Sequence, residues 1–142
     1  MMFSHLHMSW AGSYTDAGLL ILRLSAGAIF IVHGWAKYTL GVAGVTGFLT
    51  SLGFPIPGIF AVILIATEII GGVALITGTW TRLAALLTGF VALIATVTVH
   101  LANGFMVSGG GYEFALLLAA VCLTLLTTGA GKYAVDAQLG MK

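Results

Sequence analysis

Charged residues are scarce in this sequence. Asp, Glu, Lys and Arg make up only 6% of the 142 residues, whereas a soluble domain contains about 25%. Hydrophobic side chains make up 60% of the chain, and its mean hydropathy is +1.14. This composition excludes a disordered chain, a coiled coil and an ordinary soluble enzyme, and it indicates an integral membrane protein that resides in a lipid bilayer. The net charge of +1 provides no basic surface, so we expect no nucleic-acid partner.

Cysteine is nearly absent as well. Cys122 is the one cysteine of the chain, which excludes an internal disulfide framework, a CxxC redox pair and a zinc ribbon. The sequence also lacks a phosphate-binding lysine loop, a dinucleotide-binding glycine fingerprint and a serine nucleophile elbow. A redox reaction would therefore need a partner subunit that carries a flavin, a metal or a reactive thiol.

Four apolar windows qualify as membrane-spanning helices, which need about 20 residues. None of them alternates polar and apolar residues as a barrel strand would. The sequence therefore predicts an all-α membrane protein, a single domain over residues 1–142 built as a four-helix transmembrane bundle. The predicted helices cover residues 17–36, 59–78, 82–101 and 113–128.

The connections between these windows are rich in glycine and proline. The first, residues 37–58, contains both prolines of the chain, which predict a turn because proline fixes φ and restricts the residue before it. Within it, residues 42–52 are apolar but short, which predicts an interfacial or re-entrant helix in the first outer loop. The second connection, residues 78–81, is a tight hairpin, and Thr81 is the expected N-cap of the third helix.

The positions of Lys and Arg predict the orientation in the membrane. With four helices, both termini share a side with the second connection. That side carries most of the basic residues, namely Arg82, Lys132, Lys142 and, one to two turns inside, Arg23. The other side carries only Lys37. Because Lys and Arg are enriched at cytoplasmic ends, we expect a multi-pass protein with both termini in the cytoplasm.

Two charged residues fall within the predicted helices. Arg23 lies about six residues into the first helix and Glu68 about ten residues from the cytoplasmic end of the second, a depth difference of about 6 Å at 1.5 Å per residue. A salt bridge between them would fix the packing of the two helices, although Arg23 could instead extend to the surface. Alternatively, Glu68 is a buried carboxylate that handles protons, and Gly71 and Gly72 on its face leave room for a flat ligand.

A second set of polar residues is expected at the outer end of the bundle. His33 and Lys37 are four residues apart and share a helical face. His100 ends the third predicted helix, and Glu113 begins the fourth. The topology therefore gathers six side chains at one depth: His33, Lys37, His100, Asn103, Tyr112 and Glu113.

Three interpretations of this outer set remain open. His, Tyr and Lys favour membrane interfaces for general reasons. Two histidines and a carboxylate are also suitable ligands for a metal ion, and two histidines can bind haem. The third interpretation is a hydrogen-bonding pocket for a quinone, because histidine and glutamate can exchange protons with its carbonyl oxygens. Of these interpretations we favour the quinone pocket, and we assign no residue as a metal ligand.

Several segments, taken in order, resemble the DoxX family. They include Leu22-Arg23-Leu24, His33-Gly34-Trp35-Ala36-Lys37, Glu68-Ile69-Ile70-Gly71-Gly72, His100-Leu101-Ala102-Asn103-Gly104-Phe105 and Gly111-Tyr112-Glu113-Phe114. The resemblance covers residues 19–136 and implies a small four-helix protein of the bacterial or archaeal inner membrane. Members of this family are associated with quinone-dependent respiration, including a thiosulfate:quinone oxidoreductase, or with oxidative stress, while most have no established reaction. The matching polar positions are Arg23, His33, Lys37, Glu68, His100, Asn103 and Glu113.

The residues and the resemblance together predict a subunit of a quinone-dependent membrane oxidoreductase. It would bind a quinone or a similar flat apolar ligand near the outer face and work with a redox partner subunit. The expected catalytic groups, which handle protons, are His33, His100 and Glu113. The expected ligand-binding groups are Lys37, Asn103, Tyr112, Glu68 and Arg23. Two alternatives are a non-catalytic membrane anchor or assembly protein, and a homo-oligomeric component of a small-molecule transporter with Arg23 and Glu68 along its path.

Overall fold

The computed structural model describes the backbone of residues 9–141 and the side chains of residues 14–141. All regular elements in this range are helical. The main helices are α1 (Ser9–Ser51), α2 (Pro57–Thr77), α3 (Thr81–Ala95) and α4 (Glu113–Thr128). The short elements are the π-helical turn η1 (Thr96–His100), the 3₁₀ turns η2 (Leu101–Asn103) and η3 (Val107–Gly109), and α5 (Val135–Gln138).

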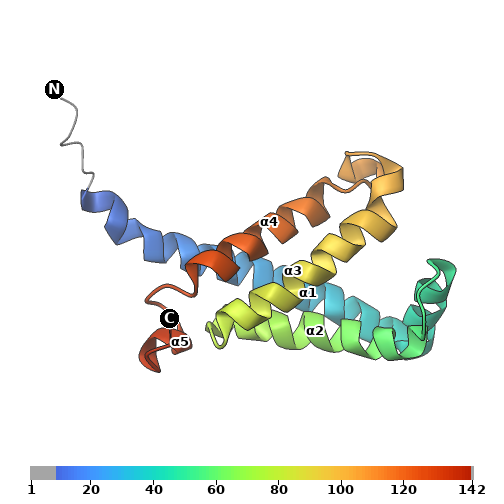
Figure 1. Cartoon of the computed structure of the whole chain (residues 1–142), viewed down its shortest axis with the longest axis horizontal. Helices are drawn as coiled ribbons and strands as arrows, with labels where there is room; N and C mark the ends of the chain where they lie inside the picture. The colour runs from blue at the N-terminus through green and yellow to red at the C-terminus, as the bar shows by residue number, and fades with distance from the viewer. Residues whose placement is uncertain (1–8, 142) are drawn as a thin grey trace.

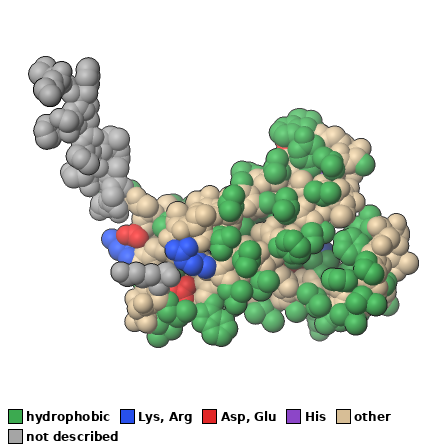
Figure 2. Space-filling view, viewed as in Figure 1, with side chains coloured by type: hydrophobic (Ala, Val, Ile, Leu, Met, Phe, Trp, Pro, Cys, Tyr) green, Lys and Arg blue, Asp and Glu red, His purple; other side chains and the backbone are tan. Residues whose placement is uncertain are grey.

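Three helices are long and apolar enough to cross a membrane. They are Tyr14–Ser51 with 38 residues, Pro57–Thr77 with 21 and Thr81–Asn103 with 23, the last combining α3, η1 and η2. The fourth apolar helix, α4, has 16 residues, which is short of the usual 20 or so. Figure 2 shows hydrophobic side chains over most of the helical surface, while the charged side chains most visible in this view gather at one end. The predicted class, a helical membrane protein, is confirmed.

The first helix extends well past its predicted end at residue 36. It continues to Ser51, with a kink at Gly41, where φ is 83° and ψ is 153°. Glycine adopts this backbone conformation at little cost, so the chain changes direction there without losing its helical form on either side (Figure 1). The segment after the kink is the short helix expected over residues 42–52, and its Val45 and Leu49 are buried with residues of α2.

Small residues allow the long helices to approach closely. A Cβ atom added at Gly27 of α1 would lie 2.6 Å from the carbonyl oxygen of Gly72 in α2, and one at Gly72 would lie 2.7 Å from that of Gly27. A Cβ at Gly89 of α3 would lie 2.8 Å from Cβ of Cys122 in α4. Such close approaches are typical of helix packing in membranes, where dispersion contacts replace the hydrophobic effect.

The helices form two antiparallel pairs, α1 with α2 and α3 with α4. The pairs pack together at the end that also holds α5, and they diverge toward the other end (Figure 1). We call the first end, defined by Arg23, Gly78 and Asp136, the clasp end. We call the second end, defined by Lys37, Glu68 and His100, the cavity end.

Candidate functional site

A cavity of about 430 Å³ lies at the cavity end and is lined by residues of both helix pairs. Its polar side chains are His33 and Lys37 of α1, Glu68 of α2, Thr98 and His100. Its walls are apolar and rich in phenylalanine: Phe30, Phe48, Phe54, Phe60, Phe90 and Phe114. An apolar cavity of this size with a few polar groups is typical of sites for small molecules.

Lys37 and Glu68 form an ion pair inside this cavity. The ammonium nitrogen of Lys37 lies 2.9 Å and 2.8 Å from the two carboxylate oxygens of Glu68. The carboxylate side chain is 6% exposed and the lysine side chain 25% exposed. An unpaired carboxylate would be costly in an apolar setting, so the ion pair with Lys37 offsets the cost of burying the Glu68 side chain. The lysine has three donors and remains partly accessible to a ligand.

His100 reaches the cavity from the π-helical turn η1. Such a turn inserts one residue into the helical register, and π-helical turns are often found at functional sites. The Nδ1 atom of His100 lies 2.7 Å from the carbonyl oxygen of Gly110. The ring is therefore held against the loop after α3 on one side while the residue lines the cavity.

His33 contrasts with His100 in having a free ring. Its ring lies beside Phe114 of α4, with centroids 6.3 Å apart and an interplanar angle of 26°. Within residues 14–141 neither ring nitrogen of His33 has a hydrogen-bond partner. This side chain can thus donate or accept a hydrogen bond.

Three of the predicted outer residues, Asn103, Tyr112 and Glu113, do not line the cavity. Instead they build the loop that holds His100. Asn103 Nδ2 donates to the carbonyl oxygen of Gly110 at 3.3 Å, and Glu113 Oε1 accepts from the backbone N–H of Val107 at 2.6 Å. The ring of Tyr112 packs edge-on against Phe105. The structure therefore places these residues outside the cavity, in the loop that contacts His100.

The expected salt bridge between Arg23 and Glu68 is not formed. Arg23 is fully buried and donates to the carbonyl oxygens of Leu75, at 3.4 Å, and of Tyr133. Its guanidinium lies at the clasp end, against Gly78. The expectation failed because the close approach of Gly27 and Gly72 sets the register of α1 against α2. Arg23 and Glu68 are thereby separated by about eight residues along the pair, or roughly 12 Å.

Asp136 completes the clasp end, and it is not among the site residues predicted from the sequence. Its carboxylate accepts hydrogen bonds from the backbone N–H groups of Trp80 at 2.7 Å and Thr81 at 2.8 Å. These are donors at the start of α3, so Asp136 supplies the cap that was expected from Thr81. Its own N–H donates to the carbonyl oxygen of Gly78 at 2.9 Å. The one available signal was an acidic residue just after the last apolar window.

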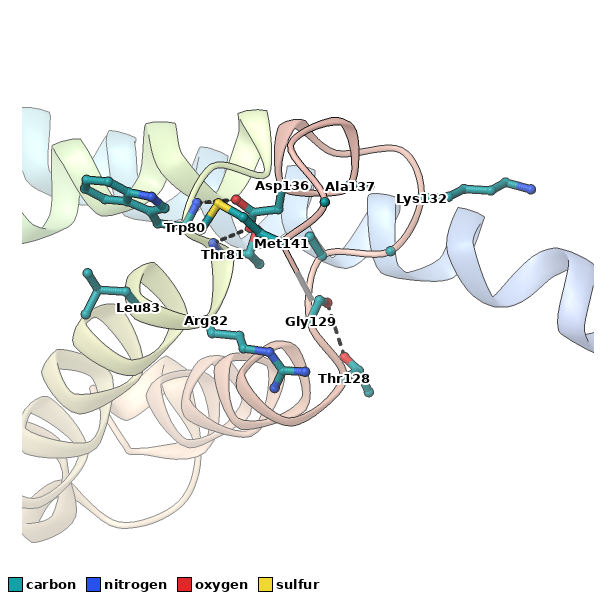
Figure 3. Close-up of a pocket in the computed structure, with 13 residues that line it drawn as sticks. Trp80, Thr81, Arg82, Leu83, Thr128, Gly129, Lys132, Asp136, Ala137 and Met141 are labelled. Atoms are coloured by element: carbon teal, nitrogen blue, oxygen red, sulfur yellow. Dashed lines mark hydrogen bonds between the residues drawn. The ribbon is translucent and has the colours of Figure 1, made fainter.

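A larger cavity, of about 760 Å³, lies at the clasp end beside Asp136. Figure 3 shows Asp136 bonded to the backbone of Trp80 and Thr81, and the side chain of Lys132 extending away from the other labelled residues. Arg82 donates to the carbonyl oxygens of Leu126 and Thr127 at the end of α4. Asp136 and Arg82 bind the backbone at helix ends, and Lys132 pairs with Asp16. This cavity is therefore a weaker candidate than the one that holds His33 and His100.

Metal binding receives no geometric support in the part of the chain that the structure describes. No group of three or more His, Cys, Asp or Glu side chains is arranged there to hold a metal ion. Glu113, the carboxylate expected to join the two histidines, is engaged with Val107 instead. Apolar and aromatic side chains form most of the cavity surface, which is typical of sites for small organic molecules.

Comparison with known proteins gives a family and one named relative. The sequence profile described as DoxX matches residues 18–101, which include most of α1 and the whole of α2 and α3. A protein of Bacillus subtilis (strain 168) named "Putative oxidoreductase CatD" is 40% identical over 57 residues, which are 40% of each chain. The match thus spans less than half the length of this relative. No solved structure matches the chain.

Proposed function

The chain belongs to the DoxX family, and from this premise we propose that it is an inner-membrane subunit that binds a quinone or a similar flat apolar ligand in the 430 Å³ cavity. The observation that carries the proposal is the composition of this cavity. Phenylalanine side chains form an apolar slot, and His33, Lys37 and His100 supply hydrogen-bonding groups at its surface. A ring with oxygen atoms at its edge suits both features.

In this proposal the polar residues have separate roles. His33 and His100 hydrogen-bond or exchange protons with the ligand oxygens, since an imidazole nitrogen can either donate or accept a proton. Lys37, held by Glu68, places a positive charge near a reduced, anionic ring. Asn103, Tyr112 and Glu113 act as positioning residues through the loop that carries Gly110, and Arg23 stabilises the bundle.

In this proposal a further component supplies electron transfer. The described part of the chain holds no cluster of metal-ligating residues, and Cys122 is buried beside Thr88. A partner oxidoreductase would therefore deliver or remove electrons. The word oxidoreductase in the name of the Bacillus subtilis relative supports a redox role. The Lys and Arg distribution supports a multi-pass arrangement in which α4 also crosses the membrane and both termini are cytoplasmic.

Thermal unfolding of the purified protein in mild detergent tests the proposal. A ligand that binds the folded state stabilises it by about 2.7 kcal/mol at about 100 times its Kd, so a short-chain benzoquinone should raise Tm. Lys37→Met and His33→Ala should reduce this ligand-induced increase, while Lys132→Met, outside the cavity, should leave it intact. Mass spectrometry of the co-purified lipids should also find a quinone in the wild type.

The outcome also separates the alternatives. If benzoquinone leaves Tm unchanged and no quinone co-purifies, the ligand-binding proposal is wrong. A non-catalytic anchor or assembly protein then becomes the better hypothesis. Flux of a solute through proteoliposomes that is altered by Glu68→Gln would instead favour a transporter component.

A further inference from the structure

The hydrogen bond between His100 and the loop fixes the tautomer of this histidine. A carbonyl oxygen only accepts hydrogen bonds, so the contact of 2.7 Å between Nδ1 and the oxygen of Gly110 places the hydrogen on Nδ1. In the neutral imidazole the other nitrogen, Nε2, then carries a lone pair and is an acceptor. The loop thus determines that neutral His100 has its acceptor nitrogen at Nε2.

The loop is built firmly enough to impose this choice. Its two ends are joined by hydrogen bonds from the N–H groups of Tyr112 and Glu113 to the carbonyl oxygens of Gly104 and Phe105, both 3.0 Å long. A Cβ atom at Gly111 would lie 2.3 Å from the oxygen of Gly104, so the backbone is closely packed there. The carbonyl of Gly110 is therefore held in place for His100.

Nε2 of His100 is left available for a ligand. Within residues 14–141 it has no hydrogen-bond partner, and His100 lines the cavity whereas Gly110 does not. Of the other acceptors in the cavity, both carboxylate oxygens of Glu68 bind Lys37, and the hydroxyl of Thr98 donates to the carbonyl oxygen of Ile94 within its own helix. Either nitrogen of His33 can carry the proton, so of the two cavity histidines His100 is the one whose tautomer a protein contact fixes.

We infer that the cavity prefers an aromatic ligand that bears a hydroxyl group, such as a hydroquinone or a phenol, over the corresponding quinone. A hydroxyl can donate to Nε2 of His100, whereas a quinone carbonyl would place an oxygen lone pair against the nitrogen lone pair. Lys37 can at the same time donate to a ligand oxygen in either form. This inference rests on the proposed function and adds the redox form of the ligand that the site recognises.

Calorimetric titration of the full-length protein in detergent tests the inference with three probes. They are an alkyl-substituted benzohydroquinone kept reduced under argon, its dimethyl ether and the matching benzoquinone. Loss of one hydrogen bond to Nε2 of His100 corresponds to about a tenfold weaker Kd. We therefore expect the hydroquinone to bind about tenfold more tightly than the ether, and more tightly than the quinone.

Two variants assign the preference to His100. His100→Phe should bind the hydroquinone and the ether equally, and His100→Gln, whose amide oxygen accepts, should recover part of the difference. His33→Phe is the matched control. It should weaken the binding of the hydroquinone and of the ether alike, so the ratio of their Kd values should not change. Nitrogen NMR of histidine-labelled wild-type protein, without any probe, should report the Nδ1-protonated tautomer for the signal that disappears in His100→Gln.

Each contrary result has a distinct meaning. Equal or tighter binding of the quinone, a preference that survives in His100→Phe, or an Nε2-protonated tautomer would overturn the inference while leaving the proposed function intact. If none of the three probes binds the wild type, the proposed function fails, and this inference fails with it.

Discussion

The two ends of the helical bundle use their polar residues in opposite ways. At the clasp end, the carboxylate of Asp136 is bonded to the start of α3 and the guanidinium of Arg23 to backbone carbonyls of α2 and the C-terminal segment. At the cavity end, Lys37 and Glu68 neutralise each other, and both histidines keep nitrogens without protein partners among the described residues. The clasp end also holds two buried polar atoms without a partner, Nε of Arg23 and Oγ1 of Thr81, but its charged groups bind backbone and stabilise the fold. The open histidine nitrogens line a cavity and are available to a ligand.

Removing the guanidinium at the clasp end should have the largest effect on stability. Arg23→Met would leave the carbonyls of Leu75 and Tyr133 without a donor and remove the cation near Asp136, at a cost of about 3 kcal/mol. Thermal unfolding in detergent measures this cost. The control is Lys132→Met, whose ion pair with Asp16 is exposed and spans 3.8 Å, so its loss should cost less than about 1 kcal/mol. Equal Tm values for the two variants would contradict the comparison.

The failed pairing of Arg23 shows what the sequence could and could not predict. Apolar runs and turn residues located α2, α4 and the combined segment of α3, η1 and η2 to within a few residues, because spanning length and the positions of proline and glycine are local properties. The partner of Arg23 depends instead on the register of α1 against α2, which the contact between Gly27 and Gly72 sets. Aligning the ends of the first two predicted helices, residues 17–36 and 59–78, gave a different register, in which Arg23 and Glu68 differed in depth by only about 6 Å.

The cavity was predictable in outline only. Topology placed the polar ends of α1, α3 and α4 together, and His33, Lys37 and His100 do line one cavity. Their roles stay a prediction. Glu113 could not be assigned to the loop from the sequence, because its bond to the N–H of Val107 depends on the path of a glycine-rich segment. Asp136 was equally hidden, since its partners Trp80 and Thr81 are distant in sequence.

Substitutions that force α1 away from α2 should cause the next largest loss of stability. This loss should differ between a substitution near the clasp end and one near the cavity end. In Gly27→Ala the new Cβ would meet the backbone oxygen of Gly72 at 2.6 Å; in Gly34→Ala, nearer the cavity, it would meet Cγ1 of Ile69 at 2.7 Å and Cβ of Glu68 at 2.9 Å. Overpacking costs about 1–3 kcal/mol, and a backbone neighbour yields less than a side chain. We expect Gly27→Ala to lower Tm more.

The two glycine variants should differ in the opposite sense in ligand binding. Gly34→Ala displaces Glu68, which holds Lys37, so it should weaken benzoquinone or hydroquinone binding more than Gly27→Ala does. Gly18→Ala is the control, because an added Cβ there has no neighbour within 4 Å and alanine favours a helix by about 1 kcal/mol. A loss of stability in Gly18→Ala as large as in Gly27→Ala would show that close approach is not the cause.

Breaking the ion pair at the cavity end should have a moderate effect. Lys37→Met leaves the carboxylate of Glu68 buried without its partner and should cost about 1–2 kcal/mol. The double variant Lys37→Met, Glu68→Gln removes both charges and should recover most of this loss. Thermal unfolding of the two single variants and the double variant gives the coupling energy. Additive losses would mean that the pair does not stabilise the bundle.

Asn103→Ala should cause the smallest loss of stability of these variants, yet it should clearly change ligand preference. Asn103→Ala removes two exposed hydrogen bonds, of 3.2 Å to Val99 and 3.3 Å to Gly110, so the loss should stay below about 1 kcal/mol. Thr124→Ala, which removes one exposed hydroxyl contact on α4, should cost a similar amount. Only Asn103→Ala should reduce the preference for hydroquinone over its dimethyl ether, because the carbonyl of Gly110 that orients His100 loses a second donor. If the preference is unchanged in Asn103→Ala, His100 is oriented by its own bond to Gly110 alone, and the loop beyond Gly110 contributes only to folding.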